Sequence, residues 1–306
     1  MSTWLITHPA CLEHDTGPGH PESIARLQTV LAALEAPEFQ FLQRQEAPQA
    51  TIDQIARVHD RSYVEELLAS VPEDGHRMLD NDTVISPGSG EAALRAAGAL
   101  CMAVDAVMAG EAERVFCAVR PPGHHAEAAK AMGFCLFNNV AIGAAHARER
   151  YRLRRVAVVD FDVHHGNGTA SMFAGRKGYL YLSSHQSPLF PDTGDPSENR
   201  PGNIYNLPLP AYTNGLSFRP MFYDELLREL EDFRPELIFI SAGFDGHLDD
   251  PLANLRLNER DFAWATEEIV SIARRHCRGR VISTLEGGYN LAALARCVAE
   301  HVKALL

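Results

Sequence analysis

Acidic and imidazole side chains alternate along one short segment of the sequence, Asp160-Phe-Asp162-Val-His164. In an extended chain, side chains two positions apart point to the same side, so Asp162 and His164 can reach a common cation. Asp245 follows another apolar run and offers a third ligand. Two carboxylates and one imidazole leave a coordination position open, as in catalytic rather than structural zinc sites. The pattern therefore predicts a catalytic metal site on Asp162, His164 and Asp245.

Two consecutive histidines, His124 and His125, follow a Pro-Pro-Gly segment. Taken alone, a His-His dipeptide is more often a structural pair than a functional one. Beside a metal, however, adjacent imidazoles suit proton transfer, provided that a partner fixes each tautomer. We expect Asp160 to hold one ring and Asn167 to hold the other. A carboxylate raises the basicity of a histidine whereas an amide only orients it, so the two rings would differ in role.

One tyrosine ends the segment Glu286-Gly-Gly-Tyr289. Two glycines allow the backbone to turn tightly and to place the phenol over a cleft. Opposite a metal, a phenol can donate a hydrogen bond to the oxyanion of a tetrahedral intermediate. We therefore expect Tyr289 to stabilise developing negative charge.

These residues follow short apolar runs that alternate with longer helical patterns over residues 1–306, with no linker between them. Such alternation predicts a single α/β domain whose mainly parallel sheet carries helices on both faces. Ligands then bind beyond the C-terminal ends of the strands, where the candidate residues fall. The expected strands are Trp4–Thr7, Val115–Val119, Val156–Asp160, Tyr179–Ser183, Leu237–Ser241 and Val281–Leu285. The expected helices are Glu22–Leu34, Ser62–Leu68, Glu91–Ala109, Asn139–Arg150, Pro220–Asp232, Glu259–Arg275 and Leu291–Leu306.

The remaining composition narrows the class of protein. The 306 residues carry a formal net charge of −12, which argues against a nucleic-acid partner and favours encounter with cationic substrates. The six cysteines form no C-x-x-C pair, as expected of reduced thiols in a cytoplasmic protein. The apolar stretch Ala92–Ala109 contains Arg95 and Asp105 and is expected to be a buried helix, so we expect no membrane association. The irregular stretch 184–214 is expected to be a functional loop.

Five segments of the sequence carry polar or glycine-rich motifs in a fixed order. They are Arg120-Pro-Pro-Gly-His-His, Gly133-Phe-Cys-Leu-Phe-Asn-Asn, Asp160-Phe-Asp-Val-His-His-Gly-Asn-Gly-Thr, Ser241-Ala-Gly-Phe-Asp and Leu285-Glu-Gly-Gly-Tyr-Asn. Together they give the sequence a resemblance to the histone deacetylase family. This superfamily includes bacterial histone deacetylase-like amidohydrolases, acetylpolyamine amidohydrolases and acetoin-utilisation proteins. The resemblance extends from Gly19-His-Pro-Glu to the C-terminal helix, and Asn167 and Asp250-Pro-Leu resemble its class II branch.

The resemblance implies a set of roles around the metal. It implies Zn²⁺, with Fe²⁺ as the alternative in the cell, on the three ligands named above. It pairs His124 with Asp160 and His125 with Asn167, and it lets Tyr289 polarise the acyl carbonyl. It also implies a structural K⁺ bound by main-chain oxygens of Asp160, Asp162 and His164 and by the Ser183 hydroxyl.

For the substrate, the resemblance implies acyl-lysine or a similarly slender acylated amine in a narrow tunnel. Phe134 and Phe190 would form the walls, and the Gly133 carbonyl would receive the amide N–H. Asp82 matches a rim position that holds a substrate backbone in some members, and Arg26 matches an arginine of the inner channel. Leu252 stands where a polyamine-preferring member carries Glu, which argues against polyamines.

Several alternatives stay open at this point. An acetylpolyamine or small-metabolite deacetylase fits the same tunnel. A ureohydrolase with two Mn²⁺ ions would share the architecture, but it needs a second Asp where this chain has His247. A non-catalytic acyl-lysine-binding module would be expected to lack one of the site residues, and none is missing. The sequence leaves homo-oligomerisation undecided.

Overall fold

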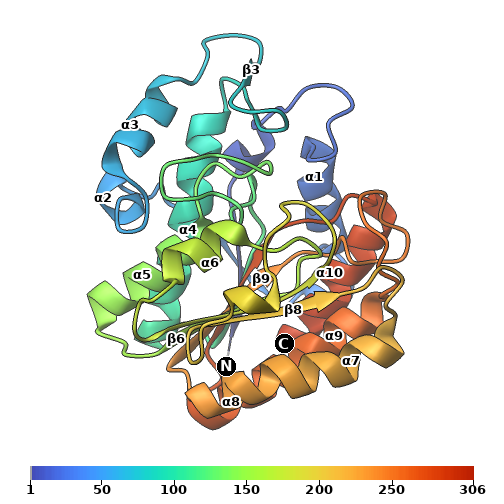
Figure 1. Ribbon diagram of the computed structural model, residues 1–306. Coiled ribbons are helices and arrows are strands. Elements are labelled where there is room, and N and C mark those ends of the chain that lie inside the picture. Colours follow the sequence, from blue (N-terminus) through green and yellow to red (C-terminus); the bar gives the residue numbers. More distant parts are fainter. Residues whose placement is uncertain (1) are drawn as a thin grey trace.

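The computed structural model describes residues 2–306, and one large sheet forms its centre (Figure 1). Its eight strands follow the order β2-β1-β5-β10-β9-β6-β7-β8, and every pair is parallel. The predicted fold class is thereby confirmed. The strands are β1 (Thr3–Thr7), β2 (Gln43–Glu46), β5 (Arg114–Cys117), β6 (Val156–Asp160), β7 (Tyr179–Gln186), β8 (Ile204–Leu209), β9 (Leu237–Ala242) and β10 (Val281–Leu285). A separate antiparallel pair joins β3 (Arg77–Met78) to β4 (Val84–Ile85).

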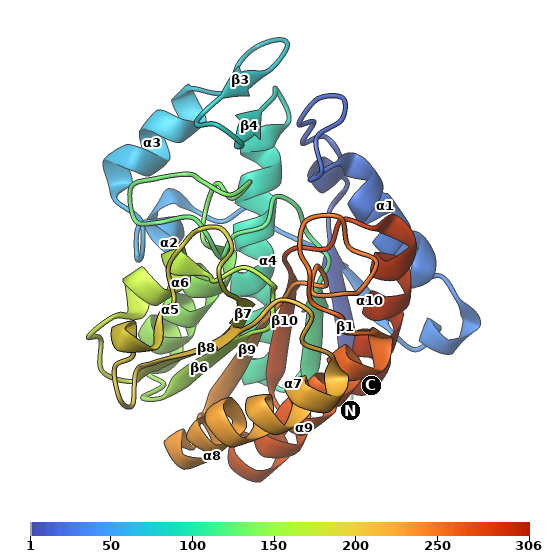
Figure 2. The ribbon, with the colours of Figure 1, turned by 45° about the vertical axis from the view of Figure 1, so that its right-hand side comes forward.

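Helices cover both faces of this sheet, as its continuously apolar strands require (Figure 2). Helices α4 and α5 lie on one face, and α7 to α10 lie on the other. The helices are α1 (Ile24–Ala33), α2 (Ile52–Ile55), α3 (Arg61–Ala69), α4 (Ser89–Ala109), α5 (Asn139–Tyr151), α6 (Asn167–Phe173), α7 (Gly215–Phe222), α8 (Arg228–Phe233), α9 (Glu259–His276) and α10 (Leu291–Leu305). Short 3₁₀ turns occur at Pro9–Leu12, Pro37–Phe39 and Pro196–Glu198, and a π-helical turn, Tyr223–Leu227, joins α7 to α8.

Helix α4 packs across the centre of its face. By length and composition it could cross a membrane, but 67% of its most apolar window is buried inside the protein. Burial of this extent agrees with the core helix expected from the sequence. Gly98 lies where the helix meets the segment before α2, and a Cβ there would overlap the carbonyl oxygen of Pro48 and lie 2.8 Å from the Ala50 nitrogen.

Several parts of the chain differ from the sequence-based expectation. Strands β2, β3 and β4 and helices α2 and α6 were not predicted. The stretch 184–214 is not entirely irregular, because it contains the end of β7 and the whole of β8. Strand β8 lies at the sheet edge, where a proline is tolerated, and Asn206 and Pro208 interrupt its apolar run. The helix expected from Pro220 begins at Gly215 instead, since the Asn214 side chain accepts from the Leu216 and Ser217 nitrogens and caps it.

We predict that Gly98→Ala lowers the melting temperature. Alanine is favoured over glycine in a helix interior by about 1 kcal/mol. Overpacking a filled core typically costs about 1–3 kcal/mol, and here the obstructing atoms are main-chain atoms that cannot rotate away. Thermal unfolding followed by circular dichroism measures the difference. A variant more stable than the wild type would contradict the close packing of α4.

Candidate metal centre and active site

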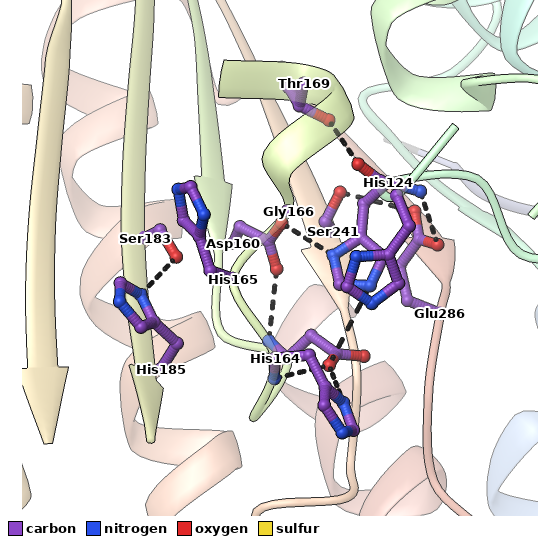
Figure 3. Close-up of polar contacts among 12 residues, drawn as sticks. His124, Asp160, His164, His165, Gly166, Thr169, Ser183, His185, Ser241 and Glu286 are labelled. Carbon is purple, nitrogen blue, oxygen red and sulfur yellow. Dashed lines mark hydrogen bonds and ion pairs between the residues drawn. The ribbon is translucent and has the colours of Figure 1, made fainter. Parts of the chain in front are cut away.

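Four neighbouring strands direct the polar residues to one edge of the sheet. Strands β5, β10, β9 and β6 are adjacent, and the segments that follow them carry the His pair, Tyr289, Asp245 and Asp162 respectively. Asp160 ends β6 in register with Ser241 on β9, so these segments start from the same level of the sheet. Figure 3 shows the resulting cluster of carboxylate and imidazole groups.

The three predicted metal ligands come together. One ligand atom from each of Asp162, His164 and Asp245 lies within 4.8 Å of the others. The Nδ1 atom of His164 is 3.1 Å from a carboxylate oxygen of Asp162 and 3.1 Å from one of Asp245. Both carboxylates are buried, and burial together with the charge of Asp162 raises the pKa of Asp245. Two buried carboxylates facing one imidazole nitrogen form a donor set that fits a divalent cation.

Main-chain N–H groups aim these carboxylates. The nitrogen of Gly287 donates to Oδ2 of Asp162 at 2.8 Å, and the nitrogen of Val163 donates to Oδ1 of Asp245 at 2.9 Å. Gly287 has no room for a side chain, because a Cβ would lie 2.5 Å from Oδ2 of Asp162 and overlap Oδ2 of Asp245. The second glycine of the Glu-Gly-Gly-Tyr segment, Gly288, adopts a φ of 119° that turns the chain toward Tyr289.

His124 is paired with a carboxylate, as the sequence predicts. Its Nδ1 lies 3.0 Å from Oδ2 of Asp160, which also accepts from the Tyr181 hydroxyl at 3.0 Å. Burial opposes a charged ring here, but the carboxylates of Asp160 and Asp162 outweigh it and raise the pKa of His124 to about 10. The ring is therefore an imidazolium at neutral pH. Sequence reasoning did not identify Tyr181, because a tyrosine inside an apolar strand resembles a core residue.

His125 has the opposite environment. Its Nδ1 lies 2.8 Å from Oδ1 of Asn167, an atom that only accepts, so Nδ1 carries the proton and Nε2 is free to take another. Burial lowers the pKa of His125 well below its usual value, and the charge of the neighbouring His124 lowers it further. The two rings are tilted with centroids 4.0 Å apart, yet their surroundings shift their pKa values in opposite directions.

Tyr289 lies half-buried beside the cluster and is held through its neighbours. Asp250 accepts from its main-chain nitrogen at 2.7 Å, and the Arg26 guanidinium lies 4.9 Å from its ring centroid. Nε of Arg26 also donates to the Gly288 oxygen at 2.6 Å. Arg26 thus holds the Gly288–Tyr289 turn through both its main chain and its aromatic ring. The resemblance implies that this arginine lies in an inner channel. Burial raises the pKa of the phenol well above its usual value, so it remains a hydrogen-bond donor.

A further buried carboxylate supports the His pair from behind. Glu286 accepts from the Gly123 nitrogen at 2.7 Å and from the His124 nitrogen at 3.2 Å, and Ser241 donates to its other oxygen at 3.3 Å. Burial raises the pKa of Glu286 to about 7. This position was visible in the sequence as part of a strand-end segment, but nothing there revealed which groups it would contact.

The two aromatic residues expected to form tunnel walls lie on different sides of the cluster. The Phe134 ring packs edge-on to Tyr289 with centroids 5.9 Å apart, whereas Phe190 packs edge-on to His125 at 5.1 Å and to His164 at 6.3 Å. Gly133 adjoins the His pair, since a Cβ there would lie 2.5 Å from Cδ2 of His125. Phe190 therefore lies beside the metal ligand His164, whereas Phe134 lies beside Tyr289.

The other predicted residues are placed less centrally. One oxygen of Asp82 accepts from the Gly133 nitrogen at 3.2 Å, so part of that carboxylate holds the tunnel loop, and contact with a substrate backbone stays a prediction. Leu252 is 37% exposed. The Ser183 hydroxyl lies 2.9 Å from Nδ1 of His185, and the monovalent-cation site stays a prediction. His247 lies 3.4 Å from Glu259 rather than beside Asp245.

Comparisons with known proteins agree with the motifs. The histone deacetylase domain matches residues 20–305. The chain is 36% identical to type-2 histone deacetylase 2 of Dictyostelium discoideum, and the match covers all of this chain but only 21% of that protein. It is 39% identical to the histone deacetylase-like amidohydrolase of Pseudomonas aeruginosa, covering 90% of this chain and 73% of that one. The solved HDA15 HD domain superposes with a TM-score of 0.92 at 29% identity, covering 99% of this chain and 88% of that chain.

We predict that Gly287→Ala impairs metal binding while Gly246→Ala does not. The first substitution forces a methyl group against both ligand carboxylates. The second lies next to Asp245, but its nearest neighbours are at 3.4 Å or more, which is ordinary contact. Metal content after dialysis against zinc and then buffer, measured by mass spectrometry, compares the two variants. Equal zinc retention by the two variants would show that metal binding does not need the close approach of Gly287 to the two carboxylates.

Proposed function

The chain belongs to the histone deacetylase family, whose members are hydrolases, and we propose that it is a zinc-dependent enzyme that deacylates acyl-lysine or a similarly slender amine. The observation that carries this proposal is the convergence of Asp162, His164 and Asp245 beside a neutral histidine and a protonated phenol. A binding module would have no need of this combination.

Asp162, His164 and Asp245 would hold the metal. When bound there, a zinc-class ion would lower the pKa of a water molecule and polarise an acyl carbonyl. The mixed carboxylate and imidazole set suits Zn²⁺ and also Fe²⁺, and we retain iron as the alternative in the cell.

The two histidines would divide the proton chemistry. Nε2 of His125 takes a proton from the attacking water, because the Asn167 contact keeps the proton of the neutral ring on Nδ1. The same nitrogen then returns the proton to the leaving amine. His124 remains protonated against Asp160 and supplies positive charge beside the developing oxyanion. Tyr289 donates a hydrogen bond to that oxyanion, since its raised pKa keeps the hydroxyl proton in place.

The substrate class follows from the walls and the rim. Phe134 packs against Tyr289 and Phe190 packs against His125, as walls of the narrow tunnel that the resemblance implies would do. The partly exposed Leu252 offers no charge to a polyamine. We therefore favour acyl-lysine, with class II-like character. A net charge of −12 favours encounter with cations, which keeps an acetylpolyamine or a cationic metabolite as the second candidate. Six buried free cysteines suit the reducing cytoplasm that we propose as its location.

The first test is metal-dependent turnover. We expect the purified protein to hydrolyse a fluorogenic acetyl-lysine peptide, to lose activity on treatment with a chelator and to regain it with added zinc. A panel of acetyl-lysine peptides, longer acyl-lysines and acetylpolyamines, compared by kcat/KM, ranks the substrate classes. Binding of acyl-lysine without hydrolysis, with either Zn²⁺ or Fe²⁺ added, would instead support the non-catalytic module.

The second test concerns the phenol. Removing one oxyanion donor typically lowers kcat by about 10²–10³-fold, and we expect Tyr289→Phe to show a loss of this size. The ring and its packing against Phe134 are kept, so the melting temperature and zinc content should match the wild type. Steady-state kinetics at saturating peptide measure the effect. Turnover close to the wild-type value would remove Tyr289 from the mechanism.

A further inference from the structure

The tautomer of His125 depends on which way the amide of Asn167 faces. An asparagine side chain carries an acceptor and a donor of nearly the same size, so a rotation by 180° exchanges them. With Oδ1 toward His125, the ring nitrogen Nδ1 must donate, and Nε2 is free to act as a base. With the amino group toward His125, Nδ1 must accept, and the proton moves to Nε2. Whatever fixes the amide therefore decides whether the base is competent.

The group that faces the other end of this amide is the carboxylate of Glu127. Its Oε1 accepts from Nδ2 of Asn167 at 2.8 Å. A carboxylate only accepts, so it cannot face Oδ1 of an amide without repulsion. Nδ2 has two further acceptors, the His125 main-chain oxygen and the Met132 sulfur, but both are at 3.4 Å and therefore weaker. Glu127 supplies the short, charge-assisted contact in the set.

We propose that Glu127 is a positioning residue of the active site, which sets the amide of Asn167 and through it the tautomer of His125. The three side chains form a relay from a half-buried loop carboxylate to the ring in the tunnel. The proposal rests on the proposed function only for the role of His125 as a base, because the relay itself is a property of the resting protein.

The placement of Glu127 suits this role and makes it testable. Its main chain is held without help from its carboxylate, since its nitrogen donates to the Lys130 oxygen at 2.9 Å. The Asn167 main chain is held in the same way, at the start of α6. Substitution of the Glu127 side chain should therefore change the polarity at the end of the relay while the loop keeps its course.

The direct readout is the protonation of the two ring nitrogens of His125 in the zinc-loaded protein. In ¹⁵N-histidine-labelled samples, the His125 signals are assigned by their loss in His125→Gln. We expect the wild type and Glu127→Gln, which keeps an acceptor oxygen, to carry the proton on Nδ1. We expect Glu127→Leu to show a mixture of both tautomers. Lys130→Leu, an exposed position on the same loop, is the matched control and should resemble the wild type.

The kinetic test measures kcat in variants that exchange the charges along the relay. Asn167→Asp places two carboxylates in contact, and their repulsion should move the introduced acceptor away from Nδ1 of His125. Glu127→Lys places a donor beside Asn167, so the amide oxygen should turn toward the lysine and the amino group toward His125. Each change should therefore lower kcat. General-base help is worth roughly 10²–10⁴-fold, and we expect each single variant to lose at least about 10-fold in kcat with little change in KM. In the double variant the introduced ammonium group donates to the introduced carboxylate, whose other oxygen again accepts from Nδ1 of His125. The kcat of the double variant should be about 10-fold or more above the value expected if the two single-variant losses multiplied.

The outcomes separate this relay from the function on which it depends. An Nδ1-protonated ring in Glu127→Leu, with kcat equal to that of Lys130→Leu, would overturn the proposal. So would strictly multiplicative effects in the double variant with all folds intact by circular dichroism. If the wild type hydrolyses no acylated amine but Glu127→Leu still changes the tautomer, the relay stands and the proposed function fails.

Discussion

The site depends on the burial of four carboxylates at one edge of the sheet. Asp160, Asp162, Asp245 and Glu286 are all shielded from water, and an unpaired buried charge is costly. Each therefore requires compensation from its surroundings. Asp160 is paired with an imidazolium and a phenol, and Glu286 accepts two main-chain N–H groups. For Asp162 and Asp245, the compensation that fits is a divalent cation shared with His164.

This constraint accounts for the local sequence around the site. The parallel strand order puts four strand ends side by side, so His164 and Asp245, which are 81 positions apart, can share one ion. Gly287 has no side chain because the carboxylates occupy that space. The same packing gives two adjacent histidines opposite states. His124 faces a carboxylate and stays charged, whereas His125 faces an amide and stays neutral. The proton transfer that we propose uses this difference between the two rings.

The sequence predicted the sheet and the convergence of its strand ends because apolar runs and the residues after them are local signals. The side-chain alternation at Asp160, Asp162 and His164 likewise depends only on backbone geometry. Contacts between distant segments were not predictable in the same way. Tyr181 resembles a core residue, Glu127 resembles a solvated loop carboxylate, and each acquires its role from a partner more than twenty positions away. Strand β8 was missed because Asn206 and Pro208 interrupt its apolar run, and the other edge strand, β2, was missed because all of its residues are polar.

The most direct measurement of the central claim is anomalous X-ray diffraction at the zinc absorption edge, from crystals of the zinc-loaded protein. The account predicts one strong anomalous peak per chain, within coordination distance of carboxylate oxygens of Asp162 and Asp245 and of a ring nitrogen of His164. A peak bound by other side chains, or two peaks bridged at this site, would contradict it. So would the absence of a peak at a zinc concentration that supports activity.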